Sequence, residues 1–359
     1  MKRVWIFIHT SHIGGAEKRF AGLWQSLQDT EGIYNIVLRK GLHDKFLKDI
    51  ELEHTLAEKR ASVFFLDETD LKTAYRSFIK KNTTAGDVLH FIGEHPFLRT
   101  KNRKQVFSIT QSSLKNMNLF GKLGQFAGIY FSDVADVLDP SIFKLMQRVF
   151  VFKRKAISRT SNSFCNIHQH NSVGFEKKKD WLVFLGRFEN MKQVKQLLAA
   201  VPQVHKAIAP IATNDLRFYF LGHGSLEAEL QEMVNQPHFK GIPITIDYTD
   251  RPNAILSRSK VFFSVQLHNN YPSRSLIEAM AAGNIPLVTD VGETRWLAKP
   301  EFSYYIPEHF TTQDVVNEIN KIFKEDAKVL GRKSGMARQV VIEEHTIEKM
   351  REYYLSLYN

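Results

Sequence analysis

The chain has 359 residues, a formal net charge of +11 and a single cysteine, Cys165. This length exceeds what one hydrophobic core usually organises, and the 43% hydrophobic and 24% charged residues are typical of a soluble globular protein, so two folded domains are expected. The lone cysteine excludes an intrachain disulfide framework and a cysteine-rich metal cluster, and we find neither a secretion signal nor an apolar run of about 18 residues, so we expect a cytoplasmic protein.

The first half of the chain alternates strand-like and helix-like patterns. The apolar run 4–8 predicts a strand, residues 12–15 form a turn, and apolar residues at helical spacing predict a helix from Ala16. Further strands are expected over residues 34–38, 63–66, 88–91, 106–109 and 128–131. The segment 153–175 is polar and rich in basic, serine and asparagine residues, so it is the best candidate for a linker.

The second half repeats this alternation. A strand over residues 181–185 leads to a turn at Gly186 and a helix through 194–201. Four more strands are expected over residues 218–221, 244–246, 261–265 and 285–289. The last segment, 342–358, has the pattern of an amphipathic helix rich in tyrosine.

Strand–helix alternation in both halves predicts an α/β fold with two Rossmann-like domains. We place the first domain over residues 1–165 and the second over 176–340, with a separate C-terminal helix over 341–359.

The most informative stretch is 261–297. A strand stops in the polar loop 266–270, a helix with Ser273 at its N-cap follows, and Gly283 and Pro286 bracket the helix end. The amino end of a helix presents unpaired N–H groups that favour a phosphate. Glu278, one turn inside this helix, has two oxygens that can accept hydrogen bonds from a vicinal diol such as a ribose. These features predict a nucleotide site.

The run Glu278-Ala279-Met280-Ala281-Ala282-Gly283 resembles the donor-binding region of GT-B glycosyltransferases of the retaining family 4. Members of that family carry two glutamates eight positions apart, and Asn270 stands at the position of the first one. An ordinary Rossmann-like crossover with a solvated glutamate remains an alternative. The resemblance implies two Rossmann-like domains that face each other across a cleft, with a C-terminal helix that crosses back to the first domain.

Two cations carry the resemblance further. Gly186-Arg187 followed by Lys192 looks like the element whose cations hold the donor diphosphate in this family. Fixed cations stabilise the negative charge that a leaving nucleoside diphosphate gains. A surface pair is the alternative, although cations near the start of a helix are unfavourable against its dipole.

Glycine turns are a weaker part of the resemblance. Gly14 and Gly15 belong to a Gly-Gly-Ala-Glu loop like the one by which the family's first domain approaches the donor, and Gly222-x-Gly224 is similar to its nucleotide-side turn. Glycines also simply permit tight turns, so neither motif is specific.

The resemblance also implies roles for the remaining donor residues. Glu278 would contact the ribose, and Asn270 would face the sugar, since an amide can both donate and accept. The backbone amides of three consecutive residues would lie near the diphosphate: Ser273, Arg274 and Ser275.

The acceptor side departs from the family pattern. Many members have a histidine after a Val/Ile-x-Thr strand of the first domain, where this chain has Gln111. His12 and His90 are the candidates that could replace it.

We expect no metal and no cofactor. The chain contains no Asp-x-Asp, the carboxylate pair that holds a metal on the diphosphate in the other common glycosyltransferase fold, and the cations Arg187 and Lys192 can supply the same charge. His168 and His170 fall in the expected linker and are interpreted as surface residues rather than metal ligands.

The positive charge is concentrated in the first half. Residues 1–170 contain 26 lysines and arginines against 16 aspartates and glutamates, whereas residues 171–359 contain 23 against 22. Clusters occur at 99–104 and 153–155. Such a surface can meet an anionic membrane, an anionic substrate or nucleic acid. Solvated surface charges without a partner are the alternative. No known nucleic-acid motif is present, so nucleic acid is disfavoured. We expect a peripheral position on the cytoplasmic face of a membrane, where the basic face would meet a lipid-linked or otherwise anionic saccharide.

The resemblance therefore implies a retaining hexosyltransferase. It would use a UDP- or GDP-type nucleotide sugar as donor and a saccharide or lipid-linked acceptor, in cell-surface polysaccharide synthesis. A nucleotide-sugar epimerase and a catalytically silent relative with the same fold remain alternatives, the second because Asn270 and Gln111 depart from the family pattern.

Overall fold

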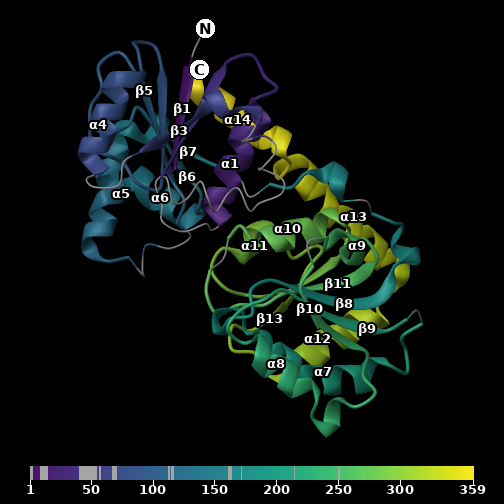
Figure 1. Cartoon of the computed structure of the whole chain (residues 1–359). Coiled ribbons are helices and arrows are strands. Elements are labelled where there is room, and N and C mark those ends of the chain that lie inside the picture. The colour runs from purple at the N-terminus through teal and green to yellow at the C-terminus, as the bar shows by residue number, and fades with distance from the viewer. Residues whose placement is uncertain are drawn as a thin grey trace. The chain divides into compact units, whose positions relative to one another are not determined.

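A computed structural model describes residues 3–8, 15–39, 55, 58–66, 71–111, 114, 117–160, 164–170, 172–213, 215–249, 251–269 and 271–359. The chain divides into two compact units (Figure 1). Unit 1 comprises Met1–Asn162 and Ile347–Asn359, and unit 2 comprises Ser163–Thr346.

Unit 1 contains, in its described part, a parallel sheet of seven strands in the order β3-β2-β1-β4-β5-β6-β7. Its strands are β1 (Arg3–Ile8), β2 (Ile33–Arg39), β3 (Val63–Leu66), β4 (Val88–Ile92), β5 (Lys104–Ile109), β6 (Val134–Val137) and β7 (Ile157–Arg159). Its helices are α1 (Gly15–Leu27), α4 (Leu71–Asn82), α5 (Leu119–Phe131), α6 (Pro140–Val149) and α14 (Ile347–Tyr358), with 3-10 turns η1 (Arg60–Ser62) and η2 (Val151–Ala156).

Unit 2 contains a parallel sheet of six strands in the order β10-β9-β8-β11-β12-β13. Its strands are β8 (Lys179–Leu185), β9 (Arg217–Leu221), β10 (Ile244–Asp247), β11 (Ser259–Ser264), β12 (Ile285–Thr289) and β13 (Tyr304–Ile306). Its helices are α7 (Val194–Ile208), α8 (Glu227–Val234), α9 (Asn253–Leu256), α10 (Arg274–Ala281), α11 (Thr294–Leu297), α12 (Thr312–Lys324) and α13 (Ala327–Glu344). Its 3-10 turns are η3 (Ile167–Gln169), η4 (Phe175–Lys177), η5 (Asn190–Lys192) and η6 (Pro237–Phe239).

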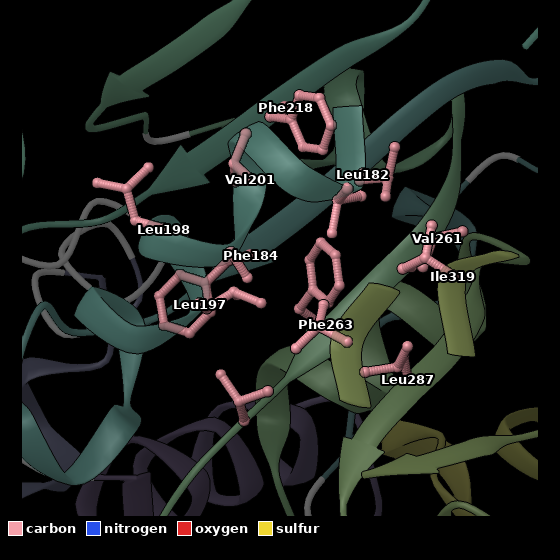
Figure 2. Packing of buried hydrophobic residues seen from close by; sticks show 14 of the residues in the cluster. Leu182, Phe184, Leu197, Leu198, Val201, Phe218, Val261, Phe263, Leu287 and Ile319 are labelled. Atoms are coloured by element: carbon pink, nitrogen blue, oxygen red, sulfur yellow. The ribbon is translucent and has the colours of Figure 1, made fainter. Parts of the chain in front are cut away.

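The strands are apolar almost throughout because helices cover the sheets. In unit 2, Phe184 and Phe263 on neighbouring strands pack against Leu197 of α7, and Ile319 of α12 belongs to the same buried cluster (Figure 2). This packing confirms the α/β class that the alternating pattern predicts.

The order of strands identifies where each sheet can bind a ligand. In unit 2 the chain moves outward from β8 to β10 and then returns to place β11 on the other side of β8. Open α/β sheets bind ligands outside the carboxyl ends of the strands at such a reversal. The relevant edge is therefore formed by the residues that follow Leu185 and Ser264.

The C-terminal helix α14 belongs to unit 1, where its tyrosines enter a buried polar cluster. The hydroxyls of Tyr353 and Tyr354 each donate to the Asp136 carboxylate at 2.7 Å, and Ser108 Oγ donates to it at 2.9 Å. Tyr358 Oη lies 2.8 Å from His90 Nδ1. Hydrogen bonds to β4 and β6 thus fasten α14 to the sheet.

The helix expected over 342–358 is wrong as a single element. Helix α13 extends to Glu344, and α14 begins at Ile347. The helical conformation is interrupted at His345 and Thr346. The His345 carbonyl accepts a hydrogen bond from the Cys165 N–H at 2.9 Å, and Thr346 pairs with Cys165 in an isolated β-bridge. Residues 342–344 therefore belong to unit 2 and not to the crossing helix.

Two further expectations in unit 1 need correction. Residues 128–131 are the last turn of α5 and not a strand, and the next strand is β6. The error arose because α5 has apolar residues on both sides and so lacks the polar face that marks most helices. The expected linker 153–175 also contains the strand β7, which pairs with β6.

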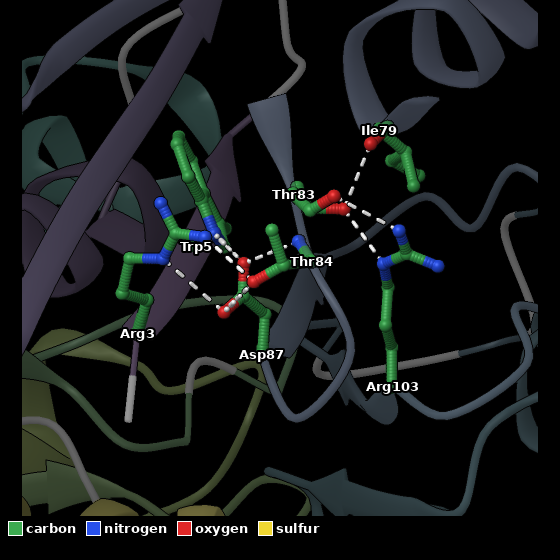
Figure 3. A network of polar contacts seen from close by, with 7 residues as sticks. All are labelled: Arg3, Trp5, Ile79, Thr83, Thr84, Asp87 and Arg103. Atoms are coloured by element: carbon green, nitrogen blue, oxygen red, sulfur yellow. Dashed lines mark hydrogen bonds and ion pairs between the residues drawn. The ribbon is translucent and has the colours of Figure 1, made fainter. Parts of the chain in front are cut away.

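The amino end of the unit 1 sheet contains a polar network (Figure 3). The buried Asp87 carboxylate accepts from Arg3 Nε at 3.3 Å and from Trp5 Nε1 at 3.0 Å. Arg103 donates to Thr83 Oγ1 at 2.7 Å and to the Thr83 carbonyl at 2.9 Å, beyond the end of α4. Arg103, part of the basic cluster at 99–104, is therefore held in a structural contact.

Candidate functional site

Two loops meet at the carboxyl edge of the unit 2 sheet. The Gly186 N–H donates to the Leu221 carbonyl at 3.0 Å, and the Phe188 N–H donates to the His223 carbonyl at 2.9 Å. These bonds hold the loop after β8 directly against the loop after β9.

Glycines make this approach feasible. Gly222 has φ +152°, and a Cβ there would lie 1.9 Å from the Gly186 carbonyl oxygen. At Gly224, with φ +158°, a Cβ would lie 2.5 Å from the Phe188 carbonyl oxygen. Neither position accommodates a side chain. Gly222 and Gly224 therefore determine the position of the loop that carries Arg187.

The two predicted cations occupy the loop after β8. Arg187 is exposed and pairs with Glu189, Nη1 to Oε1 at 2.8 Å. Lys192 ends the 3-10 turn η5, and its Nζ donates to Gln266 Oε1 at 3.1 Å. The Leu267 N–H donates to the Met191 carbonyl at 2.9 Å, so the loop after β11 is attached to the same turn.

The environment of Lys192 lowers the pKa of its ammonium to about 8. Burial is the main cause, the nearby Arg187 guanidinium lowers it further, and Glu189 opposes both. Two cations close enough to affect one another, with one of them largely removed from water, form a site that an anion would stabilise.

Gln266 is a residue of this site that the sequence did not single out. It is buried, its N–H donates to Thr289 Oγ1 at 3.0 Å, and that hydroxyl donates back to the Gln266 carbonyl at 3.0 Å. The ends of β11 and β12 thus hold Gln266, and Gln266 holds Lys192. The signal that could have revealed it is a polar residue directly after an apolar strand.

The amino end of α10 lies beside the same strand ends. Ser273 occupies the N-cap position but makes no side-chain capping bond; its Oγ lies 3.4 Å from Ser275 Oγ. A small cavity in unit 2 is lined by the end of β11, by the start of α10 and by α11. Its lining residues are Ser264, Gln266, Tyr271, Ser273, Leu276, Thr294 and Leu297.

Glu278 lies one turn inside α10. Its side chain is 16% exposed, and Oε1 accepts from Arg274 Nε at 2.9 Å. This largely buried, paired carboxylate differs from the solvated glutamate of the alternative interpretation. Asn270, the other residue expected near the sugar, lies outside the described residues.

Of the acceptor-side candidates, His90 and Gln111 lie in the described part of unit 1. His90 is fully buried, and its Nε2 lies 2.8 Å from Ser108 Oγ, while Nδ1 contacts Tyr358. Burial, reinforced by Arg19, lowers the pKa of His90 to about 3, so the ring is neutral. This geometry is that of a core histidine and does not support a role for His90 in acceptor binding.

The other unit 1 candidates give less information. Gln111 follows β5, is half-buried, and its Oε1 has no hydrogen-bond partner within the described part of the chain. Gly15 is the first residue of α1. His12 and Gly14 lie outside the described residues.

The expectation for the two histidines of the linker is only half correct. His168 is exposed, but His170 is 4% exposed, and burial beside Arg338 lowers its pKa to about 4. Among the described residues no group of three or more histidine, cysteine, aspartate or glutamate side chains could hold a metal ion, and no helix is long and apolar enough to cross a membrane.

Comparison with known proteins identifies the fold. Residues 166–337 match the model of the family Glycosyl transferases group 1. No curated protein matches the chain in sequence.

Several solved structures match nearly the whole chain. A TarM variant from S. aureus, in complex with Fondaparinux, alpha-GlcNAc-glycerol and UDP, is 14% identical with a TM-score of 0.71, covering 100% of both chains. HepE from Anabaena, in complex with UDP-glucose, is 11% identical with a TM-score of 0.69, covering 99% of this chain and 98% of its own. Sucrose-phosphate synthase from Thermosynechococcus elongatus is 14% identical with a TM-score of 0.70, covering 100% and 98%. These likenesses confirm the GT-B fold.

Proposed function

We propose that this chain, which carries a Glycosyl transferases group 1 domain on a GT-B glycosyltransferase fold, is a retaining hexosyltransferase. It would transfer a sugar from a nucleotide-diphosphate sugar to a saccharide or lipid-linked acceptor, in the synthesis of a cell-surface polysaccharide. The fold and domain are the premise, and the donor, the stereochemistry and the acceptor are the proposal.

The observation that supports it most is the cation arrangement in unit 2. Arg187 and Lys192 come from one loop, Gln266 binds the Lys192 ammonium from the neighbouring strand end, and the amino end of α10 lies beside Gln266. A partly buried ammonium whose pKa is already lowered gains stability when a diphosphate replaces the water it has lost. This is the charge pattern that a leaving nucleoside diphosphate requires.

In the proposed reaction, the bond from the anomeric carbon to the donor phosphate oxygen breaks, and a bond from that carbon to an acceptor hydroxyl oxygen forms on the same face of the sugar. The acceptor proton passes to the departing phosphate. Arg187 and Lys192 stabilise the charge on that phosphate, and Glu278 accepts hydrogen bonds from the ribose hydroxyls. No protein nucleophile is required.

The donor is proposed to be a UDP- or GDP-sugar. Structures with the same fold have been solved with UDP and with UDP-glucose. A thermal-shift screen of UDP-, GDP-, ADP- and TDP-sugars tests this choice. A donor at 100 times its dissociation constant should stabilise the protein by about 2.7 kcal/mol.

Product analysis then tests the reaction. Transfer with retained anomeric configuration, followed by NMR, supports the proposal. Conversion of the donor to an epimeric sugar without transfer would favour a nucleotide-sugar epimerase. Donor binding with neither hydrolysis nor transfer would favour a catalytically silent relative, which is the alternative that Asn270 and Gln111 suggest.

A further inference from the structure

The outward face of α5 in unit 1 is apolar. Leu119, Phe120, Leu123 and Tyr130 are all exposed there, and Phe120 is 84% exposed. Leu119, Leu123 and Tyr130 are four and seven residues apart and so lie along one side of the helix, with Phe120 next to Leu119 at its edge. The helix contains a single charged residue, Lys122. Folded proteins seldom expose a contiguous apolar surface of this kind unless it contacts something.

The opposite face of α5 is fixed against the sheet. A Cβ at Gly128 would lie 2.4 Å from the Phe107 ring, so the helix approaches β5 as closely as a glycine permits. Gln125 Nε2 donates to the Gly93 carbonyl at 2.9 Å, and Ile129 is buried. The inner face of α5 packs in the core, and the apolar stripe therefore faces outward.

The turn η2 extends the stripe. Phe126 of α5 lies 6.0 Å from Phe150, and Phe150 lies 5.9 Å from Phe152, measured between ring centroids. Lys153 Nζ donates to the carbonyls of Ile129 and Tyr130 at 3.0 and 2.8 Å. These contacts hold η2 at the carboxyl end of α5. Its Phe152, which is 71% exposed, lies beside that end.

Cations accompany these apolar residues, and acidic residues do not. Arg148, Arg154 and Lys155 are exposed on α6 and η2. No aspartate or glutamate occurs in residues 118–132 or 140–160. We call the exposed surface of α5 and η2, with these three cations, the α5–η2 face.

We infer that the α5–η2 face docks on an anionic membrane surface. Apolar and aromatic side chains entering the headgroup region, with arginine and lysine beside acidic headgroups, are the pattern of an interfacial membrane contact. A second copy of this chain fits less well, because pairing the face with itself would bring like charges together. The inference extends the proposed function, because it identifies where a lipid-linked acceptor would be met.

Of the basic cluster at 99–104, Arg99 lies at this face, with Cζ 5.4 Å from the centroid of the Tyr130 ring. Arg103 is bound to Thr83, and Lys104 belongs to strand β5. The three cations of the α5–η2 face lie beside the exposed apolar residues and are not held in such contacts among the described residues.

A single-cysteine label tests insertion directly. The native Cys165 is buried, so Phe120→Cys supplies an accessible thiol for an environment-sensitive fluorophore, and Ile211→Cys in unit 2 is the matched control. With vesicles of phosphatidylcholine and phosphatidylglycerol, we expect a blue shift and brightening at position 120 and none at position 211. Equal responses at both positions, or no response at either, would overturn the inference.

Charge reversal tests the electrostatic part. Arg148→Glu, Arg154→Glu and Lys155→Glu together should weaken binding to the same vesicles by roughly a hundredfold or more, at about fivefold for each lost cation. The control Lys206→Glu, Lys240→Glu and Lys328→Glu makes the same charge change on exposed residues of unit 2 and should have little effect. Similar losses in both triple variants would show only a dependence on net charge and would refute the α5–η2 face.

Two further readouts separate this inference from its alternatives. Donor hydrolysis in the absence of vesicles should be unchanged in the triple variant of Arg148, Arg154 and Lys155. If the proposed glycosyltransferase function is wrong, the wild-type protein will not hydrolyse the donor, whereas vesicle binding tests the α5–η2 face independently. Phe120→Ser with Phe152→Ser should reduce vesicle binding. If these serine variants instead dissociate a dimer in analytical ultracentrifugation while vesicle binding is unchanged, the face is a self-association surface and the inference is wrong.

Discussion

Unit 1 buries the Asp136 carboxylate with two tyrosine hydroxyls and a serine hydroxyl bound to it, and unit 2 places the Lys192 ammonium against the neutral amide of Gln266. Burial perturbs both groups: it raises the pKa of Asp136 and lowers the pKa of Lys192 to about 8. Asp136 receives three donors from its own unit, whereas Lys192 is near a second cation. The first arrangement is complete without a ligand, and the second is improved by an anion.

Comparing the two clusters thus separates structural from functional polar residues. A perturbed pKa alone does not distinguish them, since His90 and Lys192 are both shifted strongly by burial. The useful difference is whether the neighbouring groups satisfy the side chain. Substitutions in the Asp136 cluster should therefore change stability, and substitutions around Lys192 should change catalysis.

The largest effect is expected at the cations of unit 2. Replacing Lys192 or Arg187 with alanine should cost about 2–4 kcal/mol of transition-state stabilisation, with little change in melting temperature. Steady-state kinetics measures the loss as a fall in kcat/KM. Lys195→Ala, which removes an exposed ion pair with Glu229 on the adjoining helix, is the matched control and should remain close to wild type. Wild-type turnover in both single variants at the site would refute their assignment to the leaving group.

The converse effect is expected in unit 1. Tyr354→Phe removes one hydrogen bond to the buried Asp136 and should reduce the free energy of unfolding by about 1–3 kcal/mol. Denaturant unfolding measures the change, and donor affinity should stay the same. Tyr130→Phe removes the hydroxyl of an exposed tyrosine in the same unit and should be neutral. A loss of donor affinity in Tyr354→Phe without a loss of stability would contradict the structural role of this cluster.

A smaller effect is expected at Glu278. Glu278→Gln preserves the shape of the side chain but removes its charge, so each proposed hydrogen bond to the ribose becomes weaker. Donor affinity measured by calorimetry should fall about tenfold, which corresponds to about 1.4 kcal/mol. Because Glu278 also pairs with Arg274, Arg274→Ala serves as a comparison that removes the ion pair and keeps the carboxylate. If Arg274→Ala weakens donor binding as much as Glu278→Gln does, the ion pair and not the ribose contact explains the loss.

Donor affinity should also depend on pH. A bound diphosphate should raise the pKa of Lys192 above its value of about 8 in the ligand-free protein. Its contribution to binding is therefore fully present below pH 8 and is lost as the pH rises from about 8 towards the higher pKa of the complex, by up to tenfold per pH unit. Calorimetric titrations between pH 7 and 9.5 should show this decrease, and Lys192→Gln should show a flatter profile. An identical slope in both proteins would mean that another group titrates.

Sequence reasoning was most successful where a residue's role depends on its neighbours along the chain. The alternating apolar runs predict β1–β5 and β8–β12 but miss the strands β6, β7 and β13. Gly186, Arg187 and Lys192 fall within one loop, as their spacing suggests. It was less successful where the role depends on residues far away in sequence. Gln266 contacts Lys192 from 74 positions away in the sequence. The Cys165 N–H donates a hydrogen bond to the His345 carbonyl, which would otherwise accept one within a continuing helix.

Helix α5 is a second case in which the sequence pattern alone was insufficient. Its sequence has no polar face, so hydrophobic periodicity could not reveal a helix whose outer residues are also apolar. Only the packing of Gly128 on Phe107 shows which side is buried and which is exposed.

The smallest effect is expected from removing metal ions. In this proposal Arg187 and Lys192 supply the positive charge that a divalent ion provides when carboxylates hold it on a diphosphate, and the chain has no Asp-x-Asp to bind such an ion. Two fixed cations cost no reorganisation when the leaving group develops its charge, so they can replace a metal in that role. Sugar transfer, measured by product formation, should therefore be unchanged in excess EDTA. The Lys192→Ala variant sharpens the test, since added magnesium should restore its activity only if a metal can enter the vacated position. Complete loss of wild-type activity in EDTA, restored by manganese or magnesium, would show that the cations of unit 2 are insufficient and that the contrast with the Asp136 cluster does not identify the catalytic charge.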